Sequence, residues 1–255
     1  MNKTIKEIKA EFAQAEDNQT KSLDFLINEY KNDSRSGVKQ IVNKYIKQKE
    51  DLRKEIERTN NMKVYEKKYR QYTYIGGIDE VGRGPLAGPV CAACVILPKD
   101  CDILHINDSK KLSEKKRESL YDEIIEKAIC FGVGSSNASR IDEINILQAT
   151  YEAMKNSIAD MNPQPDLLLV DAETIPNLSI EQLSIIKGDS KSISIAAASI
   201  VAKVVRDRLM VAYDKIFPQY NFASNKGYGS KEHIEAIKKY GPCPIHRRSF
   251  IKNFI

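Results

Sequence analysis

Four acidic side chains follow directly after apolar or strand-like stretches of the sequence. They are Asp79, Glu80, Asp171 and Asp189. In open α/β sheets, binding and catalytic sites form beyond the carboxyl ends of the strands. We therefore expect the four carboxylates to meet at one edge of a sheet.

Such a cluster needs a counter-charge. Two carboxylates about 4 Å apart repel by ~4 kcal/mol at an effective dielectric of about 20, so either some are protonated or cations neutralise them. Oxygen ligands suit Mg²⁺ or Mn²⁺, and a pair of such ions suits phosphoryl hydrolysis. The three histidines and five cysteines show no zinc-ligand spacing.

A purely structural interpretation stays open, because an acid at a strand end is often a turn former or a helix cap. Asp79 and Glu80 also raise a geometric difficulty. Adjacent side chains of a regular strand point to opposite faces, so both can serve one site only if the strand ends there. The glycines that follow are compatible with such an end.

Gly82, Arg83 and Gly84 form a short turn with little side-chain bulk. Their backbone N–H groups and one guanidinium could approach a sugar-phosphate backbone closely. A tight turn that needs positive φ explains the glycines equally well.

Two other motifs have competing interpretations. Cys91 and Cys94 have the spacing of a redox pair, but they lie in an apolar stretch and are expected to be small core residues. The segment 246–248, His-Arg-Arg, either contacts phosphate or ties down the C-terminus.

The elements that must position these residues form an α/β domain over residues 73–255. Strands are expected at 72–78, 89–97, 130–133, 167–170 and 184–187. Helices are expected from Ser113 as N-cap, around 144–158, over 195–216 and over 231–240. Strands come first and then alternate with helices, which favours a mixed sheet flanked by helices.

Residues 1–72 form a basic, helical N-terminal extension. They carry the whole net charge of +5, and residues 31–70 alone carry +7. Apolar residues at helical spacing predict three helices with a turn at 32–37. The basic segment is either a solvated helix face or a non-specific contact to a nucleic-acid duplex, in which each neutralised phosphate adds about −0.9 to the salt slope.

Composition excludes several classes of protein. The longest apolar runs are far short of the ~18–20 residues of a membrane span, so no membrane contact is expected, and the first residues lack an apolar signal core. An odd number of scattered cysteines argues against a disulfide framework and favours the cytoplasm.

The stretch 78–89, IDEVGRGPLAGP, resembles the signature of bacterial ribonuclease HII. Further blocks resemble that family in the same order: 108–113 (DSKKLS), 170–171 (VD), 187–189 (KGD), 225–229 (NKGYG) and 246–250 (HRRSF). The resemblance covers residues 73–250. It implies a ribonuclease H-like fold with a mixed five-stranded sheet.

The resemblance also implies a function and roles for individual residues. The expected reaction is hydrolysis of RNA in RNA–DNA hybrids, and nicking 5′ to single ribonucleotides in duplex DNA by two metal ions, Mn²⁺ or Mg²⁺, leaving 3′-hydroxyl and 5′-phosphate ends. Asp79, Glu80, Asp171 and Asp189 match the catalytic, metal-binding acids. The residues that match substrate contacts are Gly82, Arg83, Gly84, Lys110, Lys111 and Tyr228.

A monomer is expected. Two rival functions remain: another nuclease of the same fold, such as a Holliday-junction resolvase, and a non-catalytic module that binds hybrids. A resolvase would act on all-DNA junctions and would have no use for a ribose check by Tyr228. A binding module would retain affinity without metal and show no turnover.

Overall fold

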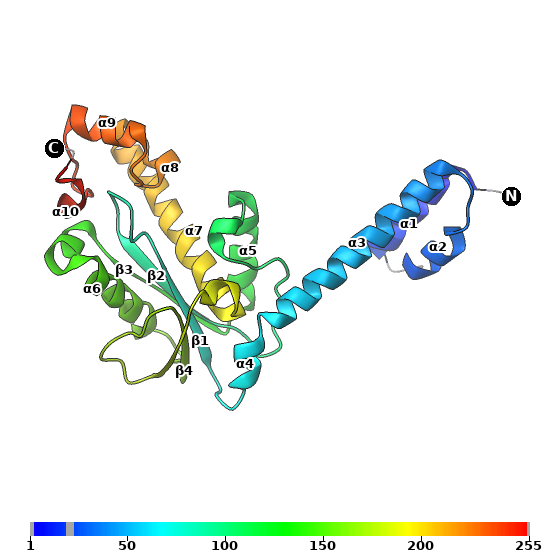
Figure 1. Cartoon of the computed structure of the whole chain (residues 1–255), viewed down its shortest axis with the longest axis horizontal. Helices are drawn as coiled ribbons and strands as arrows, with labels where there is room; N and C mark the ends of the chain where they lie inside the picture. Colours follow the sequence, from blue (N-terminus) through cyan, green and yellow to red (C-terminus); the bar gives the residue numbers. More distant parts are fainter. Residues whose placement is uncertain (1–2, 19–22, 254–255) are drawn as a thin grey trace. The chain divides into compact units, whose positions relative to one another are not determined.

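The computed structural model describes residues 3–18 and 23–253 (Figure 1). The chain divides into two units, one ending at Arg58 and the other beginning at Thr59. Residues 59–72 therefore group with the second unit. In it, Met62 is buried in a core cluster, and Glu66 accepts a hydrogen bond from the Ser192 hydroxyl at 2.6 Å. A domain boundary at residue 72 stays a prediction.

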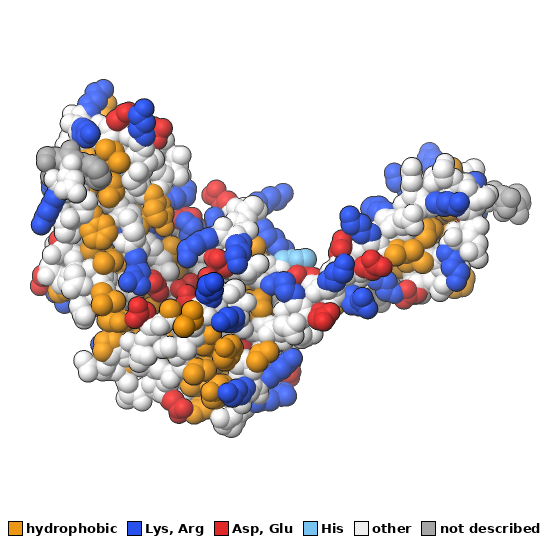
Figure 2. Space-filling model, viewed as in Figure 1, with side chains coloured by type: hydrophobic (Ala, Val, Ile, Leu, Met, Phe, Trp, Pro, Cys, Tyr) orange, Lys and Arg blue, Asp and Glu red, His pale blue; other side chains and the backbone are white. Residues whose placement is uncertain are grey.

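The first unit consists of helices α1 (Ile5–Asn18), α2 (Leu23–Tyr30) and most of α3 (Ser36–Asn61). Their apolar faces meet in one core, in which Phe12 stacks on Tyr45 with ring centroids 4.8 Å apart. The helices and the intervening turn expected from the 3.6-residue periodicity are confirmed. Basic, acidic and apolar side chains all appear on the visible face of this unit (Figure 2).

The second unit is built on a five-stranded sheet with the order β3-β2-β1-β4-β5. The strands are β1 (Ile75–Val81), β2 (Val90–Ile96), β3 (Cys130–Ser136), β4 (Leu167–Asp171) and β5 (Glu181–Ile185). The first three pair antiparallel, whereas β4 is parallel to both β1 and β5. The mixed sheet expected from the sequence is confirmed.

Helices cover both faces of this sheet (Figure 1). Helix α6 (Ala138–Ala159) packs on β2 and β3, and helix α7 (Ile193–Ile216) packs on β1 and β2, with α5 (Glu114–Lys127) against α7. The approach of α7 is close because Gly77 has no side chain: a Cβ there would lie 2.0 Å from the backbone carbon of Ser194. We call these two surfaces the α6 face and the α7 face.

Shorter elements complete the unit. They are α4 (Val64–Lys68), η1 (Ser109–Lys111), η2 (Gly188–Ser190), η3 (Pro218–Tyr220), α8 (Phe222–Asn225), α9 (Lys231–Tyr240) and α10 (Arg248–Ile251). Ser113 caps α5 as expected, since its hydroxyl accepts from the N–H of Lys116. Within the described ranges, no helix is long and apolar enough to cross a membrane.

Cys91 and Cys94 are both buried and free. They lie on opposite faces of β2, Cys91 in the core of the α7 face and Cys94 in that of the α6 face. Burial raises the pKa of the Cys91 thiol to about 11. They are core residues, as expected, and no redox pair.

Candidate active site

Asp79 and Glu80 lie inside strand β1, which corrects the expectation that the strand ends before them. The strand continues to Val81 because its pairing with β2 is unbroken, with Asp79 opposite Ala93 and Glu80 opposite Ala92. On the other side of β1, the pairing with β4 ends at Ile78↔Val170. One edge of the strand is therefore open from Asp79 onward.

The regular strand places the two side chains on opposite faces of the sheet. Ile78 belongs to the core of the α6 face and Val81 to that of the α7 face, so Asp79 faces α7 and Glu80 faces α6. Asp171, the last residue of β4, accepts the N–H of Gly188 at 2.7 Å and so lies on the α7 side. Asp189 follows in η2, just before α7 begins.

The acids lie close enough to influence each other's ionisation. Burial, then the charges of Glu80 and Asp171, raise the pKa of Asp79 well above its usual range. Burial also raises the pKa of Glu80, while the Arg83 guanidinium, 3.3 Å from its Oε1, opposes that rise. Burial, followed by Asp108 and Asp171, raises the pKa of Asp189. The combined negative charge of these carboxylates therefore favours the binding of a proton or a metal cation among them.

This donor set fits a hard divalent cation in its chemistry. Carboxylate oxygens are the ligands Mg²⁺ and Mn²⁺ prefer. Asp79 is only 5% exposed, and no Lys or Arg among the described residues forms an ion pair with it. The side chains are not closed around a single point, however. In the described ranges, no three His, Cys, Asp or Glu side chains converge in a way that could hold a metal ion.

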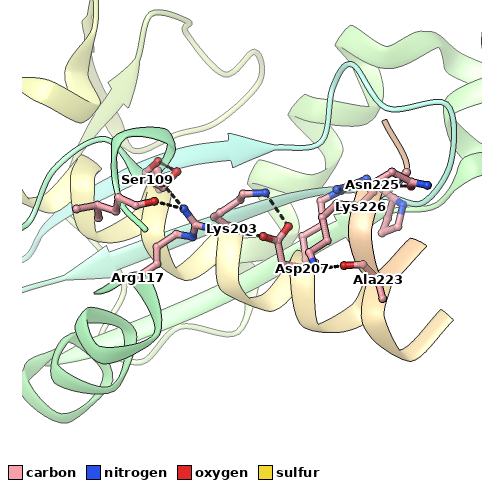
Figure 3. A network of polar contacts seen from close by, with 12 residues as sticks. Ser109, Arg117, Lys203, Asp207, Ala223, Asn225 and Lys226 are labelled. Atoms are coloured by element: carbon pink, nitrogen blue, oxygen red, sulfur yellow. Dashed lines mark hydrogen bonds and ion pairs between the residues drawn. The ribbon is translucent and has the colours of Figure 1, made fainter. Parts of the chain in front are cut away.

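Lys110 and Lys111 lie in η1, facing this cluster. Burial lowers the pKa of Lys110, but the charges of Asp79, Asp108 and Asp189 outweigh it and raise that pKa overall. A buried network positions the segment (Figure 3). Arg117 donates to the carbonyls of Ser109 and Leu112 at 2.7 and 2.8 Å.

The same network reaches helix α7. The Arg117 guanidinium lies 3.9 Å from the Asp207 carboxylate, which also accepts from Lys203 at 2.7 Å (Figure 3). Arg117 therefore fastens η1, α5 and α7 to one another. Lys110 and Lys111 are exposed at the end of this fastened segment.

The glycine turn connects β1 to β2 at the same end of the sheet. Gly82 has a φ of +89°, and a Cβ there would lie 2.2 Å from Nε of Arg206. Gly84, by contrast, has open space where a Cβ would be. Gly82 is therefore required by the backbone conformation and by the close approach of Arg206. Gly84 meets no such restriction, and its missing side chain leaves the turn accessible.

Tyr228 lies on a loop that packs against this turn. The Gly227 carbonyl accepts the N–H groups of Leu86 and Ala87 at 2.8 and 3.3 Å. The Tyr228 side chain is 43% exposed, so its ring is open to a ligand. The structure brings Tyr228, the glycine turn and the lysines to the same end of the sheet as the acids.

Two buried histidines, His233 and His246, hold the backbone of this loop in place. The His233 and His246 Nε2 atoms are 3.0 Å apart, and His233 Nδ1 lies 2.8 Å from the Tyr228 carbonyl. The Cys243 N–H donates to His246 Nδ1 at 2.9 Å, so His246 must donate through Nε2 and His233 through Nδ1. This series of hydrogen bonds, from Cys243 through His246 and His233 to Tyr228, requires both imidazole rings to be neutral.

Sequence reasoning missed Arg206 and left Arg247 undecided. Both are fully buried, and both donate to backbone carbonyls around the glycine turn. Arg247 therefore ties the C-terminal segment down and has no exposed surface for phosphate. An arginine within the apolar run of α7 was the available signal for Arg206.

Comparison with known proteins agrees with these features. The family model described as ribonuclease HII matches residues 76–253, and that of the ribonuclease HII N-terminal domain matches residues 4–70. The ribonuclease HII of Lachnoclostridium phytofermentans is 65% identical over 88% of both chains. That of Bacillus subtilis is 49% identical over 97% of this chain and 96% of its own.

Among solved structures, ribonuclease H2 from Pyrococcus horikoshii OT3 superposes with a TM-score of 0.60 at 26% identity. The match covers 71% of this chain and 97% of that one. With the acids, glycine turn and Tyr228 loop at one end of a mixed sheet, and with both family models matched, this chain belongs to the ribonuclease HII family and is a nuclease that hydrolyses RNA phosphodiester bonds.

Proposed function

We propose that the chain hydrolyses the RNA strand of RNA–DNA hybrids and nicks duplex DNA 5′ to single embedded ribonucleotides. The products would carry 3′-hydroxyl and 5′-phosphate ends. One observation carries the finer part of this proposal: the open glycine turn packs directly against the Tyr228 loop beside the acidic cluster. A nuclease for all-DNA substrates has no need of two adjoining surfaces that examine consecutive sugars.

We assign the metal-binding role to Asp79, Glu80, Asp171 and Asp189, with Mn²⁺ or Mg²⁺ as the cofactor. When bound, such ions activate water and neutralise charge on the reacting phosphate. The support is the raised pKa of Asp79, Glu80 and Asp189, which reflects charge that a cation would relieve. Because Glu80 lies on the other face from Asp79, it would reach the shared edge only around the end of β1.

The remaining residues recognise the substrate. The 2′-hydroxyl distinguishes RNA from DNA, and the turn formed by Gly82, Arg83 and Gly84 can contact it from its open side, where Gly84 has no side chain. The Tyr228 ring would pack on the next sugar, where a hydroxyl would not fit. Lys110 and Lys111 would meet the phosphates that flank the reacting bond.

Three duplexes of one sequence test the proposal. One is all DNA, one contains a single ribonucleotide, and one pairs an RNA strand with DNA. With Mn²⁺, the wild type should cut the last two only, and Asp79→Asn should cut neither. Cleavage of the all-DNA duplex or of an all-DNA four-way junction by the wild type would count against the proposal. Undiminished cleavage of the two ribonucleotide-containing duplexes by Asp79→Asn would also count against it. The monomeric state and the cytoplasmic location stay predictions.

A further inference from the structure

Arg206 of α7 and Arg247, next to α10, lie beneath the glycine turn with no exposed surface. Each spreads its donors over three backbone carbonyls. Arg247 donates to Gly88 at 3.0 Å through Nε, to Arg83 at 2.8 Å through Nη1, and to Gly82 at 2.5 Å through Nη2. Arg206 donates to Pro89, Lys226 and Ala87 at 2.9, 2.9 and 3.1 Å.

Within residues 3–18 and 23–253, neither guanidinium forms an ion pair with a carboxylate. Burial lowers the pKa of both, that of Arg247 to about 9. Burying two like charges side by side is costly unless their donors are satisfied, and here carbonyl oxygens alone satisfy them.

The hydrogen bonds from Arg247 to the Gly82 and Arg83 carbonyls determine which way the N–H groups of the turn point. In a trans peptide, the C=O and the following N–H point in opposite directions. Because the carbonyls of Gly82 and Arg83 point at Arg247, the N–H groups of Arg83 and Gly84 point away from it. Among the described residues, neither N–H has an acceptor.

Arg206 joins the turn to the loop that carries Tyr228. It holds Pro89 and Ala87 on the turn and Lys226 on the loop, and its Cζ lies 6.0 Å from the centre of the Tyr228 ring. Arg206 therefore sets the separation between the turn and the ring together with the two backbone hydrogen bonds from Leu86 and Ala87 to the Gly227 carbonyl. Lysine has the same charge but only one nitrogen, so it cannot hold three carbonyls in this arrangement.

We propose that Arg206 and Arg247 are positioning residues for ribonucleotide recognition: Arg247 aims two backbone N–H donors at the substrate, and Arg206 fixes the distance from that turn to Tyr228. This inference rests on the proposed function. Neither arginine touches the substrate, and both act through the turn and the loop.

The test compares Arg206→Lys and Arg247→Lys with the wild type and with Arg208→Lys. Arg208 also lies on α7, but its side chain is 52% exposed and pairs with Glu118, so it is a matched control. Single-turnover cleavage of the one-ribonucleotide duplex is measured against enzyme concentration, and thermal unfolding gives the folded fraction.

Both buried-site variants should raise the half-saturating concentration roughly tenfold or more at a similar limiting rate per folded molecule, as expected from losing an oriented, charge-assisted contact. Arg208→Lys should match the wild type. A wild-type half-saturating concentration in either active variant would overturn the proposal. So would failure of both to fold, because it would assign the arginines to stability alone. An inactive wild type would instead refute the proposed function.

Discussion

Asp79→Asn should make the metal-free protein more stable, although it removes a residue that we assign to catalysis. Asp79 is 5% exposed, and its neighbours Glu80 and Asp171 disfavour its ionised form. Asparagine has nearly the same shape, and its oxygen can still accept the Glu80 N–H, which lies 2.8 Å from Asp79 Oδ1. At a pH at which Asp79 is ionised, the substitution therefore removes a charge and little else.

The magnitude follows from the sheet. Asp79 and Asp171 come directly after the last paired residues of two adjacent parallel strands, and adjacent strands lie about 4.8 Å apart. Two charges ~5 Å apart at an effective dielectric of about 20 repel by ~3 kcal/mol. Side-chain movement and salt reduce that value, so we expect a gain of about 1–2 kcal/mol. For a domain of this size the gain corresponds to roughly 2–8 °C in Tm.

Metal should reverse the order. Free Mn²⁺ at a hundred times its Kd stabilises a protein by about 2.7 kcal/mol, and the variant, which lacks one ligand, should gain less. Thermal unfolding is followed by circular dichroism in EDTA and across a Mn²⁺ titration, with the exposed Asp122→Asn on α5 as control. A variant that is less stable than the wild type in EDTA, or equally stabilised by Mn²⁺, would refute the reasoning.

Three further outcomes are expected. Gly82→Ala should lose about 2–4 kcal/mol of stability, because φ is +89° and its Cβ would lie 2.2 Å from Arg206. Gly84→Ala should have a free energy of unfolding in urea within ~0.5 kcal/mol of the wild type, yet it should bind the one-ribonucleotide duplex more weakly. Equal stabilities of the Gly82→Ala and Gly84→Ala variants would contradict this prediction. Burial lowers the pKa of His246 to about 4, so its contribution to stability is complete above the unfolded pKa of ~6.5 and is lost as pH falls toward 4. Between pH 6.5 and 4, the free energy of unfolding measured in urea should fall more steeply for the wild type than for His246→Asn. Parallel pH curves would exclude this contribution of His246 to stability. Removing residues 1–58 should preserve cleavage but weaken duplex binding and flatten its salt dependence, whereas an unchanged slope would favour a solvated face.

The sequence predicts the features that depend on short-range patterns. Apolar and β-branched runs locate four of the five strands, whereas β5 lies at Glu181–Ile185 and so begins three residues before the expected 184–187. The 3.6-residue spacing locates the helices, and Ser113 marks a helix start that the structure caps with its hydroxyl. The four acids are found in the same way, because each follows an apolar run. Their roles as ligands stay a prediction.

The features that escape prediction depend on distant contacts. Arg206 donates to a carbonyl 117 residues away in sequence, and Arg247 to one 165 residues away. No local pattern encodes such pairs. The opposite orientation of Asp79 and Glu80 follows from the unbroken pairing of β1 with β2, which a neighbouring strand imposes. The His233–His246 contact likewise forms only when α9 and the C-terminal segment meet.

The measurement that tests the central claim most directly maps the cut in a duplex with one embedded ribonucleotide, end-labelled and incubated with the wild type and Mn²⁺. We predict a single cut at the phosphate 5′ to the ribonucleotide, with a 3′-hydroxyl on one product and a 5′-phosphate on the other. A cut on the 3′ side, a 2′,3′-cyclic phosphate end, or equal cleavage of the all-DNA duplex would contradict the account.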